Sequence, residues 1–144
     1  LAVCSIKCWN DIVNHLKPYS VEMGGLIVGK IFQSLTLKKT VVLMENIVKS
    51  VDHKSSSVSL EMGSGIWNTA NCSLDDEQAV VGWYHSHPNL GAFFSGTDRM
   101  NQKANFSSSF HVGLVYDPVR EELASFRGAD SMQMDVNKIM WVEI

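Results

Sequence analysis

AVVGWYHSHPNLGAFFSGTD, residues 79–98, is the most informative segment of the chain. Its first seven residues are mostly apolar and include β-branched valines, as in a buried strand. Pro88 has no N–H to donate and therefore ends regular pairing just beyond them. We expect a strand over 79–85 that stops abruptly at two histidines, and a helix over 98–106 after the intervening loop.

The two histidines of this segment have the spacing of a metal site. His85 and His87 lie two residues apart, and the period of two in a strand places both imidazoles on one face, with backbones about 6.5–7 Å apart. Asp98 follows after ten intervening residues, enough chain to cross a loop and enter a helix that faces back. Two histidines and one carboxylate leave one tetrahedral position open, which is the arrangement of a hydrolytic zinc.

Simpler interpretations of the same residues remain open. An isolated H-x-H is usually a pair of exposed histidines. Ser95 and Asp98 also fit a capping box, in which both side chains satisfy free N–H groups at a helix start. Trp83 shares the alternation of the histidines and is either a wall of the site or a core residue, whereas Ser86 is expected to point to the opposite face.

In the rest of the chain, apolar residues recur either about every 3.6 residues, as in a helix, or every two residues, as in a strand. This pattern predicts helices at 5–16 and 60–70, and strands at 25–32, 41–51, 110–116 and 123–127, the first two strands joined as a hairpin. In the tail, Met132, Met134 and Val136 alternate, whereas Ile139, Trp141 and Val142 fit either period, so no element type is assigned there. We therefore expect a single α/β (α+β) domain over 1–144, a mixed sheet covered by helices.

Composition excludes several classes of protein. The 144 residues carry 12 basic and 15 acidic side chains, a net charge of −3, and have no Lys/Arg block, so nucleic acid is not an expected partner. The longest stretch without charged residues, 78–97, contains His, Ser, Asn and Pro, so no membrane span is expected. The odd number of cysteines (Cys4, Cys8 and Cys72) favours a reducing compartment, and we expect a cytoplasmic location. A start at Leu1 rather than Met is interpreted as an excised domain.

Residues 82–98, GWYHSHPNLGAFFSGTD, resemble the JAMM (MPN+) metalloprotease family, whose motif is H-x-H-x10-D with Ser three residues before the Asp. The family also carries E-x-x-G-x-x-x-G upstream, and Glu22, Gly25 and Gly29 match it. Taken alone, Glu22 would be interpreted as an exposed carboxylate at the start of a strand, and the glycines as a result of close packing.

The resemblance implies a zinc enzyme with one ion per chain. His85, His87 and Asp98 would be the metal ligands, and Glu22 would accept the proton of the metal-bound water and pass it to the leaving amine. The Ser95 hydroxyl would lie near the substrate carbonyl and stabilise its oxyanion.

The resemblance also implies a deubiquitinase-type isopeptidase, which cleaves after the C-terminal glycine of ubiquitin or a ubiquitin-like modifier. Such a tail would add to a sheet edge, between walls formed by residues 89–94 and 54–60. Residues 91–94 read GAFF where several relatives carry Cys after the glycine, so the preference for a chain linkage is left open. The alternatives are a peptidase for a sulfur-carrier-like protein and a metal-free MPN scaffold. A third is an enzyme that needs an activating protein partner.

Overall fold

The computed structural model describes residues 1–50, 67, 70, 71 and 74–143. In these residues the chain forms helices α1 (Ile6–Leu16) and α3 (Gly96–Asn105) and the 3-10 helix η1 (Val136–Lys138). The strands are β1 (Ala2–Ser5), β2 (Gly24–Ser34), β3 (Lys39–Lys49), β4 (Ala79–Ser86), β5 (Val112–Asp117), β6 (Glu122–Arg127), β7 (Met132–Met134) and β8 (Met140–Val142). None of the helices among these residues is long and apolar enough to span a membrane.

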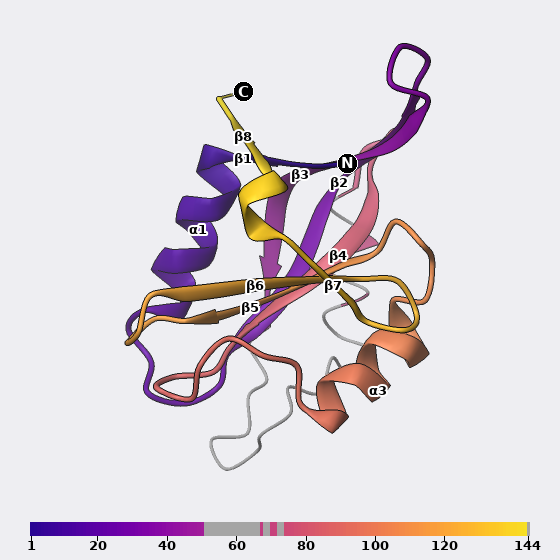
Figure 1. The fold of residues 1–144 in the computed structure, drawn as a ribbon. Helices are drawn as coiled ribbons and strands as arrows, with labels where there is room; N and C mark the ends of the chain where they lie inside the picture. Colours follow the sequence, from indigo (N-terminus) through magenta and orange to yellow (C-terminus); the bar gives the residue numbers. More distant parts are fainter. Residues whose placement is uncertain (51–66, 68–69, 72–73, 144) are drawn as a thin grey trace.

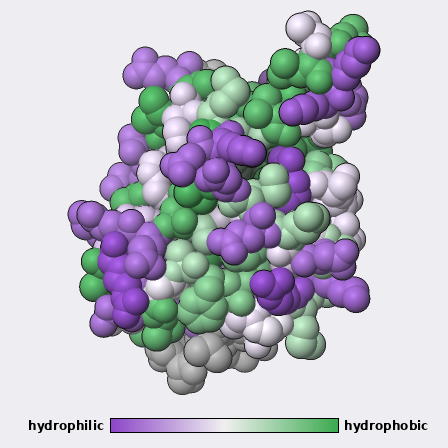
Figure 2. All heavy atoms as spheres, viewed as in Figure 1, coloured by the Kyte–Doolittle hydropathy of each residue, from purple (hydrophilic) through white to green (hydrophobic). Residues whose placement is uncertain are grey.

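The eight strands form one mixed sheet in the order β7-β6-β5-β4-β2-β3-β1-β8. Strand β2 is antiparallel to both β3 and β4, whereas β4 and β5 run parallel. The predicted β2–β3 hairpin is confirmed, and its tip projects from the body of the fold (Figure 1). Hydrophobic and hydrophilic residues lie side by side on this tip (Figure 2), where Leu35 is 91% exposed.

Helix α1 covers one face of the sheet. Its N-cap is Ser5, whose side chain accepts from the N–H of Cys8, so the predicted helix at 5–16 is confirmed with Ser5 as its cap. Cys8, Ile12 and Leu16 pack in a buried cluster with residues of β2, β3, β4 and β5. The preceding strand β1 was not predicted, because its four residues are held by pairing with β3, some forty residues away in sequence.

The opposite face carries an aromatic cluster that extends to the C-cap of α3. This cluster consists of Leu26, Ala70, Trp83, Phe94, Phe106, Val115, Ala124 and Phe126. Helix α3 begins at Gly96, two residues before the prediction, because its N-cap is Ser95. Of the helix predicted at 60–70, only Trp67 and Ala70 lie among the described residues, and both are helical.

The tail uses three short elements, which explains why no single period described it. Strand β7 pairs with β6, η1 follows, and β8 pairs with β1 in parallel. The sheet therefore begins and ends with strands of three residues. The predicted strand at 110–116 begins only at Val112, because the N–H of His111 closes a turn onto the carbonyl of Ser108.

Candidate metal centre

The end of β4 brings both histidines of the motif into the interior. His85 pairs with Gly24 of β2 on one side and with Val115 of β5 on the other. His87 follows the strand, and its backbone N–H donates to the carbonyl of Tyr116 at 3.0 Å. Because β4 is an inner strand, neighbours on both sides fix the two backbones. The side chains are buried, so the interpretation as a pair of exposed histidines is wrong.

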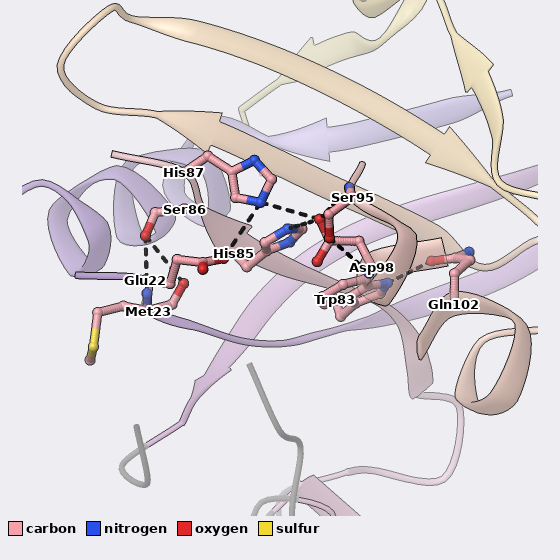
Figure 3. A network of polar contacts seen from close by, with 9 residues as sticks. All are labelled: Glu22, Met23, Trp83, His85, Ser86, His87, Ser95, Asp98 and Gln102. Atoms are coloured by element: carbon pink, nitrogen blue, oxygen red, sulfur yellow. Dashed lines mark hydrogen bonds and ion pairs between the residues drawn. The ribbon is translucent and has the colours of Figure 1, made fainter. Parts of the chain in front are cut away.

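Asp98, in the first turn of α3, reaches both histidines. Its Oδ2 lies 3.1 Å from Nε2 of His85 and 3.2 Å from Nε2 of His87 (Figure 3). The same oxygen accepts from the backbone N–H of Ser95 at 2.9 Å, and the Ser95 hydroxyl accepts from the N–H of Asp98 at 3.1 Å. The predicted capping box is therefore confirmed, and it holds the Asp98 carboxylate against the imidazoles.

Glu22 enters the cluster from the segment just before β2. Its Oε1 lies 3.5 Å from Nε2 of His87, and one ligand atom from each of Glu22, His85 and His87 lies within 4.8 Å of the others. Glu22 is buried, so the interpretation as an exposed carboxylate is wrong. Two overlapping three-residue donor sets result, because Asp98 and Glu22 approach the same pair of imidazoles.

The unpaired atoms of this cluster fit a metal ion. Nδ1 and Nε2 of His85, Nδ1 of His87 and Oε1 of Glu22 are buried without a hydrogen-bond partner. Nε2 of His85 and the nearby Asp98 oxygen are close but misaligned for a hydrogen bond. Two ligands of a tetrahedral zinc lie about 3.3 Å apart. The measured 3.1 and 3.2 Å from Asp98 to the two imidazoles match that spacing.

Burial and mutual contact set the charges of the cluster. Burial raises the pKa of Glu22 to about 7, with His87 opposing and Asp98 adding to the shift. Burial lowers the pKa of His85, which keeps this imidazole neutral. Burial alone would raise the pKa of Asp98, but the contacts with both histidines outweigh it and hold that pKa below its ordinary range. A neutral imidazole and an ionised Asp98 are the forms that bind metals.

The family of the chain follows from its match over residues 6–128 to the family described as prokaryotic homologs of the JAB domain. The chain belongs to the JAB family. The predicted resemblance to JAMM (MPN+) proteins is thereby confirmed. This JAB domain is 31% identical over 107 residues to COP9 signalosome complex subunit 5 of Drosophila melanogaster, covering 70% of this chain and 31% of that protein. It is 28% identical over 105 residues to the ubiquitin carboxyl-terminal hydrolase RPN11 of Saccharomyces cerevisiae, covering 69% of this chain and 32% of that protein.

Solved structures support the fold of this JAB domain. Protein DSY2949 from Desulfitobacterium hafniense has a TM-score of 0.73 at 18% identity, covering 100% of this chain and 94% of that one. A JAB1/MPN domain protein from Archaeoglobus fulgidus has a TM-score of 0.59 at 14% identity, covering 97% and 98%. The predicted mixed α+β fold is therefore confirmed. The chain spans only about a third of the length of the two curated relatives named above.

Trp83 proves to be both core and site wall in this JAB domain. Its ring stacks on His85 with centroids 4.5 Å apart and planes 6° apart. Its Nε1–H donates to Oε1 of Gln102 at 2.5 Å, and Gln102 donates from Nε2 to the carbonyls of Phe106 and His111. Gln102 lies one turn after Asp98, so the bond between Trp83 and Gln102 ties α3 to β4 behind His85 and Asp98 (Figure 3).

Gln102 was not identified from the sequence, because nothing distinguishes a buried glutamine from an exposed one on a polar helix. In the structure it is fully buried. Gly113 of β5 makes room for the pair. A Cβ there would lie 2.7 Å from Oε1 of Gln102 and 3.0 Å from Nε1 of Trp83.

Asp117 was also missed, although it shapes the loop beside His87. This buried carboxylate accepts from the N–H groups of Asn89 and Gly91, at 2.9 and 2.8 Å. It also accepts from two N–H groups of the turn that follows β5. Burial would raise the pKa of Asp117, but these bonds outweigh it and the pKa lies below the ordinary value. Asp117 precedes Pro118, a pair that is common in turns, but nothing in the sequence indicates that its carboxylate also fixes a second loop.

Two further contacts explain the approach to Glu22. Ser86 points away from the histidines, as expected, and its hydroxyl accepts from the N–H of Met23 at 3.0 Å, which fixes the residue after Glu22 (Figure 3). A Cβ at Gly25 would overlap the carbonyl oxygen of Val48 and lie 2.8 Å from the Tyr84 hydroxyl. Close packing between strands therefore accounts for Gly25 without a metal.

Proposed function

We propose that this JAB domain is a zinc-dependent isopeptidase that hydrolyses the bond after the C-terminal glycine of ubiquitin or a ubiquitin-like modifier. The observation that carries the proposal is the convergence of His85, His87, Asp98 and Glu22 in one buried cluster with unpaired ring nitrogens. The name of the yeast relative, a ubiquitin carboxyl-terminal hydrolase, supports the substrate class.

His85, His87 and Asp98 would hold one zinc ion, since these three offer the shortest distances between donor atoms. Zinc supplies two things when bound: it lowers the pKa of water to about 7 and it polarises a carbonyl group. Trp83 and the Ser95 N–H keep the His85 ring and the Asp98 carboxylate in place. The preformed ligands reduce the cost of ordering the site.

Glu22 is the proposed general base and acid. Its Oε1 has no hydrogen-bond partner, so it is free to accept the proton of the attacking water. The same oxygen would then give that proton to the departing amine of the substrate lysine, and the carboxylate would be regenerated. The bonds between Ser86 and Met23 hold the adjacent backbone and so limit the positions Glu22 can take.

Ser95 is the proposed oxyanion donor. Its oxygen already accepts from the N–H of Asp98, while the hydroxyl hydrogen remains to donate. Ser95 is half-buried beside the cluster, where a substrate carbonyl could approach. One such donor contributes about 3 kcal/mol to stabilising a transition state.

The loop at 89–94 is the proposed contact for the modifier tail. Phe93 is 46% exposed and its ring centroid lies 4.8 Å from that of His87, while Leu90 is 54% exposed. These apolar surfaces would cover an extended Gly-Gly end as it approaches the cluster. Residues 54–60, the other expected wall, lie outside the described part of the chain.

The proposal is tested by incubating the protein with a panel of ubiquitin dimers and ubiquitin-like fusions, with and without a chelator. Cleavage that stops with chelator and returns with zinc supports it, and the panel names the modifier. Zinc is measured per chain in parallel. Absence of bound zinc after metal-replete purification would favour the metal-free scaffold. One zinc per chain without cleavage would favour an enzyme that needs a partner, so the panel is repeated with cell extract added.

A further inference from the structure

A cavity lies on the other face of the sheet from the candidate metal centre. Its volume is about 240 Å3, and Val112 of β5 forms part of its wall. Val112 packs in the buried cluster on the α1 side, whereas Val115, the partner of His85 in β5, packs in the aromatic cluster. Three residues of strand, about 10 Å, separate the two positions along β5. The cavity is therefore distinct from the proposed catalytic site.

The lining of the cavity comes from six elements, β1, β3, β5, β6, β7 and η1. In Figure 1 η1 lies in front of the sheet, and both η1 and the residues at the N-terminus contribute to this lining. The lining residues are Leu1, Ala2, Lys39, Val112, Ser125, Arg127, Met134, Asp135, Lys138 and Ile139. Apolar side chains form much of the wall, and positive charges from three different elements face the same space.

These positive charges are not neutralised within the described part of the chain. Arg127, Lys39 and Lys138 make no ion pair or side-chain hydrogen bond among the described residues. Nη2 of Arg127 is buried and has no hydrogen-bond partner, and burial lowers the pKa of this guanidinium. The one carboxylate in the lining, Asp135, instead accepts from the N–H of Asn137 at the start of η1.

A guanidinium at the wall of a partly apolar cavity is suited to an oxyanion. Its planar donors match the two oxygens of a carboxylate or phosphate, and such charge-assisted bonds are stronger inside a protein than in water. The cavity has the volume of about eight waters and is smaller than the 300–1,000 Å3 of drug-sized sites. We propose that it binds a small molecule through a carboxylate or phosphate group, held by Arg127 with Lys39 and Lys138 beside it.

The test is a titration of 15N-labelled protein followed by NMR at constant ionic strength. Inorganic phosphate is one probe and butyrate, a carboxylate with a short apolar chain, is the other. We expect saturable shift changes at Val112, Met134 and Ile139, and none at His85 or His87. Saturation by phosphate alone or by butyrate alone tells which oxyanion the site takes.

Variants separate a built site from general attraction to a basic surface. Arg127→Gln should weaken binding about tenfold or more, as expected for loss of charge-assisted bonds. Lys138→Gln should weaken binding about threefold. Because Lys138 is exposed, this variant should remain folded even if Arg127→Gln does not. Lys30→Gln is the control, since Lys30 lies outside the cavity and faces Glu77 at 3.6 Å. Shifts that never saturate, or equal weakening by Lys138→Gln and Lys30→Gln, would overturn the proposal.

Discussion

Two buried histidines on opposite faces of the sheet differ in one respect. His15 of α1 places Nδ1 2.7 Å from the hydroxyl of Tyr84, with the rings edge to face. His85, the next residue after Tyr84 along β4, has no hydrogen-bond partner for either ring nitrogen. Burial lowers the pKa of both histidines, to about 4 for His15.

The difference separates a structural histidine from one that is arranged for a ligand. A buried polar atom without a partner costs stability, so an unpaired atom that persists needs a reason. Around His15 the partner is a protein side chain. Around His85 the ionisable neighbours are His87 and Asp98, and the Asp98 carboxylate lies at about the spacing of two ligands on one ion from both imidazoles. Burial and pKa alone do not distinguish the two histidines, whereas hydrogen bonding does.

The largest expected effect is on zinc binding, which should differ between variants of His87 and His15. His87→Ala should abolish zinc binding, because it removes one of the three donors closest together. His15→Ala should retain one zinc per chain, although it leaves the Tyr84 hydroxyl without its partner. Elemental analysis of both purified variants measures the stoichiometry. Full zinc content in His87→Ala would show that the donor set is wrong.

The next effect separates metal binding from chemistry. Glu22→Gln should lower turnover by several orders of magnitude, about 10³-fold or more, because the amide cannot accept a proton. Zinc content should stay at the wild-type level if Asp98 rather than Glu22 is the third ligand. Loss of zinc in this variant would favour the alternative set of Glu22, His85 and His87. Turnover is measured with the substrate that the panel selects.

The proximity of three candidate donor residues could be predicted because they lie close together in sequence. His85, His87 and Asp98 are read from one strand, one loop and one capping box, all within fourteen residues. Glu22 was found only through the family resemblance, because its contact with His87 crosses more than sixty residues.

The supporting residues could not be predicted, because their contacts are long-range. Gln102 pairs with Trp83 nineteen residues away, and Asp117 accepts from Asn89 at twenty-eight. Nothing in local period or composition distinguishes these polar residues from exposed ones. Strand β1 was not predicted for the same reason, because it is a strand only through its pairing with the distant β3. Such residues are recognised only when the sheet order is known.

A smaller effect is expected from the support behind His85. Trp83→Phe keeps an aromatic ring against His85 but removes the N–H that Gln102 accepts. Zinc affinity, measured by competition with a chelator, should fall about tenfold, as for other residues that orient ligands. Phe126→Leu is the matched control, because Phe126 lies in the same cluster and stacks on Phe94 at 3.9 Å. If both variants lose affinity equally, the effect is general loosening of the core.

The smallest effect concerns His15 and the pH dependence of folding. The pKa of His15 is about 4 in the folded protein against an ordinary 6.5, chiefly through burial and then through Lys49. Between these values the unfolded chain binds a proton that the folded chain does not. The free energy of unfolding should therefore rise as pH increases from 4 to 6.5, by about 3 kcal/mol from this residue, and level off above.

The variant that tests this is His15→Gln, which cannot titrate but can still bond to the Tyr84 hydroxyl. The comparison is between His87→Ala and the double variant His87→Ala/His15→Gln. Neither protein should bind zinc, so loss of zinc at acid pH does not contribute to the difference. The remaining histidines contribute equally to both proteins. Urea unfolding at pH 4.5, 5.5, 6.5 and 7.5 should give a flatter dependence in the variant, because its amide binds no proton over this range. Parallel curves would mean that His15 keeps its ordinary pKa despite burial, and pKa as well as hydrogen bonding would then distinguish His15 from His85.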